Sequence, residues 1–151
     1  MALILLLELI YIVEKNNLEI SSKWIEKYKF SVTNGRNATY TLDVPESYGG
    51  DDSGPSALEL TIMSLVGCLG TSYKMIADRM HLTVNDVEVK AIADKTLEDK
   101  TVTAIHLELL IKSQDPREKL EKCLHMAEEN CPVDLIFHQT QIPIDTKLTI
   151  N

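Results

Sequence analysis

Basic residues are scarce in this 151-residue chain, which has 15 lysines and arginines against 23 aspartates and glutamates. The formal net charge of −8 repels phosphate backbones and anionic lipid headgroups. We therefore expect neither a nucleic-acid partner nor a membrane partner. Glycine is also scarce, with six residues, and none of them forms a phosphate-binding loop, because Gly49-Gly50 and Gly54 lie in an acidic segment.

The chain has only three cysteines, an odd number at wide spacing. This pattern excludes the disulfide framework of a small secreted domain. It favours a reducing, cytoplasmic location, in which a pair of cysteines would be functional rather than structural.

One long hydrophobic run occupies residues 1–13, and it carries neither a basic segment nor the cleavage site of a signal peptide. It is shorter than the ~20 residues that a membrane-spanning helix needs, and Glu8 interrupts it. We interpret residues 1–20 as an apolar extension of unknown role, docked on this domain or on a partner subunit. Since no repeat or low-complexity linker follows, residues 21–151 are predicted to form a single domain.

Residues 23–44 alternate between apolar and polar side chains on both sides of Asn34-Gly35, which predicts a β-hairpin. A three-residue loop, residues 33–35, would place Val32 opposite Arg36 and Tyr28 opposite Tyr40. In that register Arg36 lies on the apolar, inward-facing side of the sheet. The alternative is that Arg36 points into water at the tip of the hairpin.

The remainder predicts the element order ββ-α-ββ-α-β, an α+β domain in which an antiparallel sheet packs against one very apolar helix. That helix begins with a capping box of Ser56 and Glu59 and runs to about Met80. Few charges precede Lys74, so its first half should be buried nearly all round. One sheet cannot cover so much apolar surface, and we expect a homodimer. The other predicted elements are strands at 83–93, 101–112 and 142–150, and a helix at 115–130 that is followed by a short helical turn.

Two cysteines are candidates for chemistry. Cys68 lies midway along the apolar helix between Gly67 and Gly70, each of which costs ~1 kcal/mol relative to alanine and so indicates a close approach there. Cys131 precedes Pro132 at a helix end, where a thiol is less buried. Cys123 is assigned no role. A small apolar side chain in the core is the competing interpretation of Cys68, because cysteine is among the most buried residue types.

A metal site is a further alternative, since Cys123, His125, Cys131 and His138 are possible ligands. Their spacing matches none of the paired patterns of structural zinc. No histidine or aspartate is placed in the sequence to suggest a cysteine hydrolase. We therefore expect no metal and no bound cofactor.

The segments Gly49–Glu59, Gly67-Cys68-Leu69-Gly70 and Asn130-Cys131-Pro132-Val133 together resemble the OsmC/Ohr family, the osmotically inducible and organic hydroperoxide resistance proteins. The resemblance extends from about Trp24 to Ile150. It implies an intertwined homodimer whose antiparallel sheets wrap around two central helices. It also implies thiol-dependent reduction of hydroperoxides in oxidative-stress defence, with electrons from an external dithiol such as a lipoyl group.

By this resemblance Cys68 is the peroxidatic thiol and Cys131 the resolving thiol, so that Cys68 sulfenic acid becomes a Cys68–Cys131 disulfide. A thiolate in an apolar helix needs a nearby cation, and Arg36 matches the family's hairpin arginine. The family's reductases hold that arginine with a glutamate ten residues before the first cysteine. Here that position is Leu58, and Glu59 lies one residue further on, about 100° around the helix. The alternative function is a non-catalytic domain of this fold that binds apolar ligands.

Overall fold

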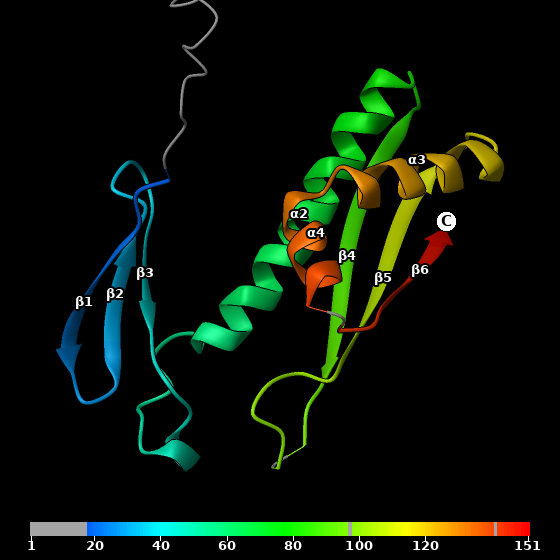
Figure 1. Cartoon of the computed structure of the whole chain (residues 1–151). Coiled ribbons are helices and arrows are strands. Elements are labelled where there is room, and N and C mark those ends of the chain that lie inside the picture. The colour runs from blue at the N-terminus through cyan, green and yellow to red at the C-terminus, as the bar shows by residue number, and fades with distance from the viewer. Residues whose placement is uncertain (1–17, 97, 141) are drawn as a thin grey trace, which may run out of the picture. The chain divides into compact units, whose positions relative to one another are not determined.

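The computed structural model describes residues 18–151 except 97 and 141, so the apolar run of residues 1–13 lies outside the described residues. The chain divides into two compact units, Met1–Ser56 and Ala57–Asn151. Each unit has its own three-stranded sheet, with the strand orders β1-β2-β3 and β4-β5-β6. The prediction of an α+β protein is confirmed (Figure 1).

The first unit is an antiparallel meander of β1 (Ser21–Glu26), β2 (Lys29–Thr33) and β3 (Thr39–Leu42), followed by the short 3₁₀ helix η1 (Glu46–Tyr48). The sequence predicted one strand before Asn34, where the structure has the two strands β1 and β2. The chain instead turns at Lys27, whose φ is +43°, and Trp24 pairs with Phe30 across the turn. The indole N–H of Trp24 donates to the Lys27 carbonyl over 2.9 Å and helps to fix this turn.

The predicted register of the β2–β3 hairpin is wrong. Val32 pairs with Tyr40, whereas the prediction placed Val32 opposite Arg36 and Tyr40 opposite Tyr28. The cause is the Asn34 side chain, whose Oδ1 accepts the backbone N–H groups of three loop residues at 3.0–3.2 Å: Arg36, Asn37 and Ala38. These bonds stabilise a five-residue loop in place of a three-residue one. Arg36 therefore lies in the loop and is exposed, and it does not occupy the inner face of the sheet.

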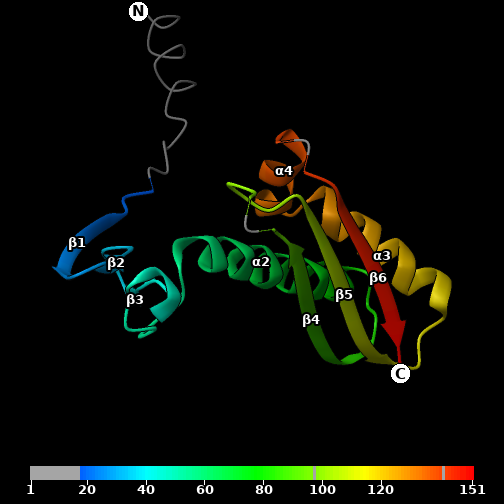
Figure 2. The same cartoon turned by 90° about the horizontal axis from the view of Figure 1, so that it is seen from below.

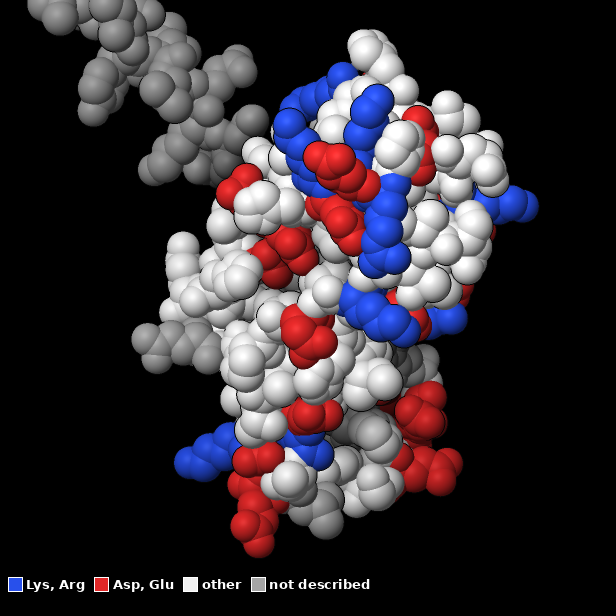
Figure 3. Space-filling model, turned by 90° about the vertical axis from the view of Figure 1, so that its right-hand side faces the viewer, with Lys and Arg blue, Asp and Glu red and all other residues white. Residues whose placement is uncertain are grey.

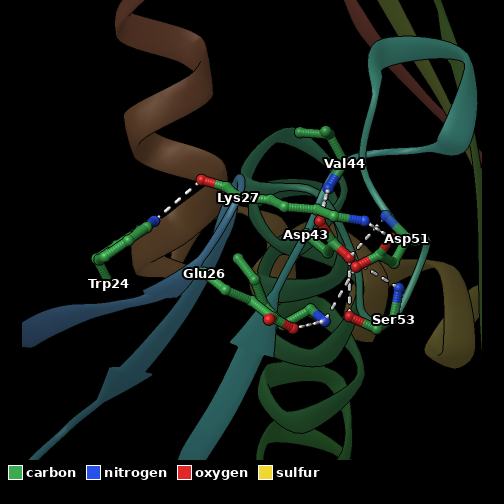
Figure 4. Close-up of polar contacts among 8 residues, drawn as sticks. Trp24, Glu26, Lys27, Asp43, Val44, Asp51 and Ser53 are labelled. Atoms are coloured by element: carbon green, nitrogen blue, oxygen red, sulfur yellow. Dashed lines mark hydrogen bonds and ion pairs between the residues drawn. The ribbon is translucent and has the colours of Figure 1, made fainter.

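The loop after β3 is tied to one buried carboxylate (Figure 4). Asp43 is 2% exposed and accepts hydrogen bonds from the backbone N–H groups of Val44, Asp51 and Ser53 and from the Ser53 hydroxyl, at 2.8–3.2 Å. The Ser53 hydroxyl and these backbone groups lower the pKa of Asp43 to about 2.

The second unit begins with α2 (Ala57–Arg79), which starts directly after Ser56 as predicted. The other elements also follow the predicted ranges closely: β4 (Val84–Asp94), β5 (Ala104–Ser113), α3 (Arg117–Glu129), α4 (Pro132–Gln139) and β6 (Ile144–Ile150). Alternate β5 side chains, among them Ile105, Leu107 and Leu109, are buried in the core with side chains of α2 and α3. Figures 1 and 2 show the three helices beside this sheet.

This second sheet is mixed, whereas the sequence predicted antiparallel pairing. β4 and β5 are antiparallel, but β6 runs parallel to β5, with Leu109 opposite Leu148. α3 and α4 lie between β5 and β6 in the chain. They provide the long crossover that a parallel pair requires.

Within this unit α2 is buried on one face, so the unit alone does not give its first half the nearly all-round burial that the sequence predicts. Its buried residues are Leu65, Leu69, Tyr73, Ile76 and Ala77, whereas Met63 and Met75 are more than half exposed. Among the described residues, α2 alone is long and apolar enough to cross a membrane by length and composition, and 28% of its most apolar window is buried. The core helix of a soluble protein also meets that criterion.

Candidate functional site

The candidate site lies where α2 meets the start of α4. Cys68, near the middle of α2, is partly exposed, whereas Cys131 is fully buried, so the expectation that the thiol at the helix end is less buried is wrong. The two thiols hydrogen-bond to each other, although 62 residues separate them in the sequence. All three cysteines are free thiols. The second unit therefore brings together the two cysteines that the sequence singled out.

Local structure fixes the direction of the Cys131 thiol. Cys131 is the N-cap residue of α4, and Pro132 occupies the first helical position, which its ring favours. The thiol sulfur accepts the backbone N–H of Asp134 over 3.5 Å, and the Cys131 carbonyl accepts the N–H of Leu135 over 3.1 Å. The side chain thus caps the helix, where the N-terminal dipole favours a thiolate.

Burial and, second, the hydrogen bond of the Cys131 thiol with Cys68 raise the pKa of Cys131 to about 11, against the helix N–H groups that lower it. Cys131 is therefore held as a thiol at neutral pH. Cys68 is the more accessible sulfur of the pair, and its neighbours along α2 are aliphatic, including Leu65 and Leu69. A molecule from solvent thus meets Cys68 first.

The third cysteine belongs to the core. Cys123 on α3 is fully buried, and its thiol donates to the Tyr73 carbonyl of α2 over 3.6 Å. Burial raises the pKa of Cys123 to about 11. His125 is exposed and pairs with Glu129 of its own helix at 3.4 Å. Within residues 18–151, leaving out 97 and 141, no three histidine, cysteine or acidic side chains are grouped to hold a metal ion.

Two predicted site residues lie away from the thiols or in the other unit. Glu59 is exposed in the first turn of α2, nine residues before Cys68. At 1.5 Å per residue this is about 13 Å along the helix axis, so Glu59 does not contact Cys68 directly. Arg36 belongs to the first unit, in its exposed hairpin loop.

Sequence reasoning missed two other cations in the first unit, which a carboxylate holds in place (Figure 4). Asp51 pairs with Lys27 at 2.5 Å and with Lys29 at 3.4 Å, and these ion pairs lower the pKa of Asp51. The close spacing of Lys27 and Lys29 beside a strand end was the available signal.

Asp134 was missed as well. It is 3% exposed, and it lines a hollow of about 360 Å³ between α3, α4 and β6. Burial raises the pKa of this carboxyl group against the opposing effect of His138, whose Nε2 lies 3.1 Å from Oδ2. Its position within the otherwise apolar segment Pro132–Phe137 was the signal that could have identified it.

A second hollow, of about 500 Å³, lies along α2 and β4. Gly67 and Gly70 line it together with Val66, Met75, Val87 and Val89. A methyl group at Gly67 would meet nothing within 4 Å, whereas one at Gly70 would lie 3.3 Å from the Val89 side chain. Gly70 thus permits the close packing of α2 on β4, and Gly67 leaves open space. In contrast to this apolar hollow, the face in Figure 3 mixes acidic and basic side chains.

Comparison with known proteins identifies the family. The family model described as OsmC-like protein matches residues 50–147, about two-thirds of the chain. No curated protein matches the sequence significantly. An OsmC-like protein from Mycoplasma pneumoniae superposes with a TM-score of 0.80 at 15% identity, covering 90% of this chain and 98% of that one.

Two organic hydroperoxide resistance proteins share the fold more distantly. The protein from Legionella pneumophila gives a TM-score of 0.63 at 14% identity, over 91% of this chain and 98% of that chain. OhrB of Bacillus subtilis gives 0.58 at 18% identity, over 89% and 98%. The family match and these superpositions confirm the resemblance that the cysteine motifs indicated. The chain is a member of the OsmC-like protein family.

Proposed function

We propose that this protein reduces organic hydroperoxides through Cys68 and Cys131. The observation that carries the proposal is the contact between the two thiols, one accessible and one buried. A redox dithiol needs two sulfurs close enough to form a bond after the first has been oxidised. Family membership and the names of the Legionella and Bacillus neighbours add support.

The reaction has three steps. The Cys68 thiolate attacks the peroxide, the O–O bond breaks, and the alkoxide leaves and takes up a proton to become an alcohol. Cys131 then attacks the sulfur of Cys68 sulfenic acid, so that an S–S bond forms and the oxygen leaves as water. An external dithiol of the lipoyl type finally reduces the Cys68–Cys131 bond by thiol–disulfide exchange and is itself oxidised to a cyclic disulfide. The proposal requires no metal and no bound cofactor.

The aliphatic surroundings of Cys68 favour an organic hydroperoxide over hydrogen peroxide. The apolar hollow beside Gly67 also favours the second candidate, a domain that binds an apolar ligand without catalysis. The two proposals differ in what happens to the peroxide, because a binding domain leaves its concentration unchanged.

The deciding experiment mixes the purified protein with cumene hydroperoxide and dihydrolipoamide and follows the loss of peroxide. We expect turnover that Cys68→Ser abolishes. Cys123→Ala is the matched control, because Cys123 is a buried core thiol, and it should retain the activity. Activity that survives Cys68→Ser would contradict the mechanism. If the unmodified protein shows no turnover, the peroxidase proposal falls and the second candidate, an apolar-ligand-binding domain, stands.

The predicted roles of Arg36 and Glu59 belong to the same proposal. If Arg36 favours the thiolate, Arg36→Met should slow alkylation of Cys68 at pH 7 by roughly tenfold and change it little at pH 10. Lys27→Met and Lys29→Met test the two cations held by Asp51 in the same assay. Equal rates for Arg36→Met and the unmodified protein would remove Arg36 from the site, and with it the proposed role of Glu59.

We also propose that the protein works as a homodimer. Met63 and Met75 on α2, and Trp24, Tyr28 and Tyr40 in the first unit, are all more than half exposed. Apolar surface of this extent is typical of an interface. Sedimentation at micromolar concentration should give twice the 17.0 kDa mass of one chain, and a monomer would contradict the proposal.

A further inference from the structure

The starting point is the buried carboxyl group of Asp134, which the proposed reaction does not use. Its side chain is 4% exposed, and Oδ2 accepts no hydrogen bond. Its close partner is the His138 imidazole, one helical turn further along α4, with Nε2 at 3.1 Å. Burying a carboxylate is costly unless it is paired.

Helix stability alone does not explain this burial. An acidic side chain in the first turn of a helix interacts favourably with the dipole even when it is exposed to solvent. Exposed Glu118 already does so in the first turn of α3. An exposed aspartate in α4 would give the same benefit without the desolvation cost. The burial of Asp134 therefore indicates a requirement for its particular position.

That position links α4 to the Cys131 thiol. The backbone N–H of Asp134 donates to the Cys131 sulfur, while its carboxyl group lines the hollow formed with α3 and β6. The Cys131 thiol itself contacts Cys68 on α2. One residue thus has its backbone N–H on the resolving sulfur and its side chain buried in α4 beside the hollow that α3 and β6 also line.

We propose that Asp134 is a positioning residue for Cys131. Buried on the inner side of α4 and paired with His138, it fixes the rotation of the first turn of α4, so that the resolving sulfur meets the sulfur of Cys68. This inference rests on the proposed function of the two thiols. Its specific consequence concerns the fate of oxidised Cys68, because a misplaced Cys131 leaves the sulfenic acid open to a second peroxide.

The two fates of Cys68 sulfenic acid are chemically distinct. Attack by Cys131 forms the S–S bond and releases water. Attack by the sulfenate on a second hydroperoxide breaks its O–O bond, gives the sulfinic acid and releases an alcohol. In folded protein the ratio of disulfide to sulfinic acid therefore reports the placement of Cys131.

The test treats reduced protein with a small excess of cumene hydroperoxide and measures both products by mass spectrometry. We expect Asp134→Asn to shift the ratio at least fivefold toward sulfinic acid, and His138→Gln to shift it in the same direction. Glu129→Gln is the matched control, since it removes a similar pair with His125 beside the same hollow without touching α4. It should leave the ratio unchanged.

His138 is exposed, so His138→Gln keeps the test valid if Asp134→Asn does not fold. A second arm oxidises the same proteins with diamide, which joins two thiols without any peroxide. The disulfide should then form at least fivefold more slowly in both α4 variants. If the unmodified protein forms the disulfide with diamide but not with peroxide, only the peroxidase proposal is overturned. If both α4 variants give the same product ratio and the same rate of disulfide formation as the unmodified protein, the role of Asp134 is overturned.

Discussion

The sharpest consequence of the site geometry is a difference in reactivity among the three thiols. Burial and the hydrogen bond with Cys68 raise the pKa of Cys131 to about 11, and burial raises that of Cys123 to about 11. An ordinary cysteine has a pKa of about 8.5. At pH 7 each buried cysteine therefore contains about 300-fold less thiolate than an unstructured cysteine peptide.

Part of this difference is offset, because a more basic thiolate is a better nucleophile. With a Brønsted coefficient of about 0.45, a pKa difference of about 2.5 makes the thiolate of the buried cysteine roughly 13-fold more reactive than that of the peptide. Alkylation of Cys131 should thus be roughly 25-fold slower than that of the peptide at pH 7, before any steric hindrance by burial. Cys68 is partly exposed and should be the first residue modified.

The assay exposes fully reduced protein to iodoacetamide and follows each cysteine peptide by mass spectrometry. Labelling of Cys131 should keep rising about tenfold per pH unit beyond pH 9, because its thiol is still protonated there. Cys68→Ala should accelerate it only a few-fold, since burial is the larger cause of the raised pKa. In guanidinium all three cysteines should react alike. Labelling of Cys131 in the folded protein at the peptide's rate would refute the reasoning.

Three further predictions concern stability and assembly. Burial raises the pKa values of Cys123, Cys131 and Tyr73, so these groups bind protons more tightly in the folded state than in the unfolded state. The melting temperature should therefore stay constant to about pH 9 and fall as the pH approaches 11. A melting temperature that circular dichroism shows to be unchanged over this range would contradict the prediction. Asp43→Ala removes the acceptor for three backbone N–H groups and should accelerate hydrogen exchange at two of them, Asp51 and Ser53, by tenfold or more. Because the pKa of Asp43 is lowered to about 2, acidification of the unmodified protein through that pH should do the same, and full protection at pH 1.5 would argue against this role. Leu69→Ala, at a buried position of α2, should lower the free energy of unfolding in urea by about 2–5 kcal/mol. Met63→Lys, at an exposed position of the same helix, should mainly weaken self-association in sedimentation. The reverse pattern would place the interface elsewhere.

The elements of the second unit could be predicted from the sequence because their signals are local. The helical spacing of apolar residues after Ser56 and the alternation around Leu107 correspond closely to α2 and β5. The turn at Lys27 had no such signal, because a lysine with a positive φ replaces the usual glycine or asparagine. The hairpin register depends on three hydrogen bonds to one Asn34 oxygen, which alternation of apolar residues does not reveal.

The parallel pairing of β6 and the burial of Asp134 depend on contacts between segments far apart in the sequence. The region that follows Cys131 reads as a short helix, but its sequence does not say which face meets α3 and β6. The meeting of Cys68 and Cys131 was likewise implied by family resemblance and not by their spacing. Sequence patterns thus gave the helices and strands, while the site arises from how α2 and α4 pack.

The unequal burial of the two thiols suits a two-step reaction better than two equally reactive sulfurs would. A second accessible thiolate would compete for the peroxide and could be oxidised on its own. Cys131 is protected from this because burial and the Cys68 hydrogen bond keep it protonated. On the proposed mechanism, oxidation of Cys68 replaces the thiol that helps to hold the Cys131 pKa high. The helix N–H groups then act on Cys131 with less opposition, which favours its thiolate a few-fold, while burial still raises its pKa.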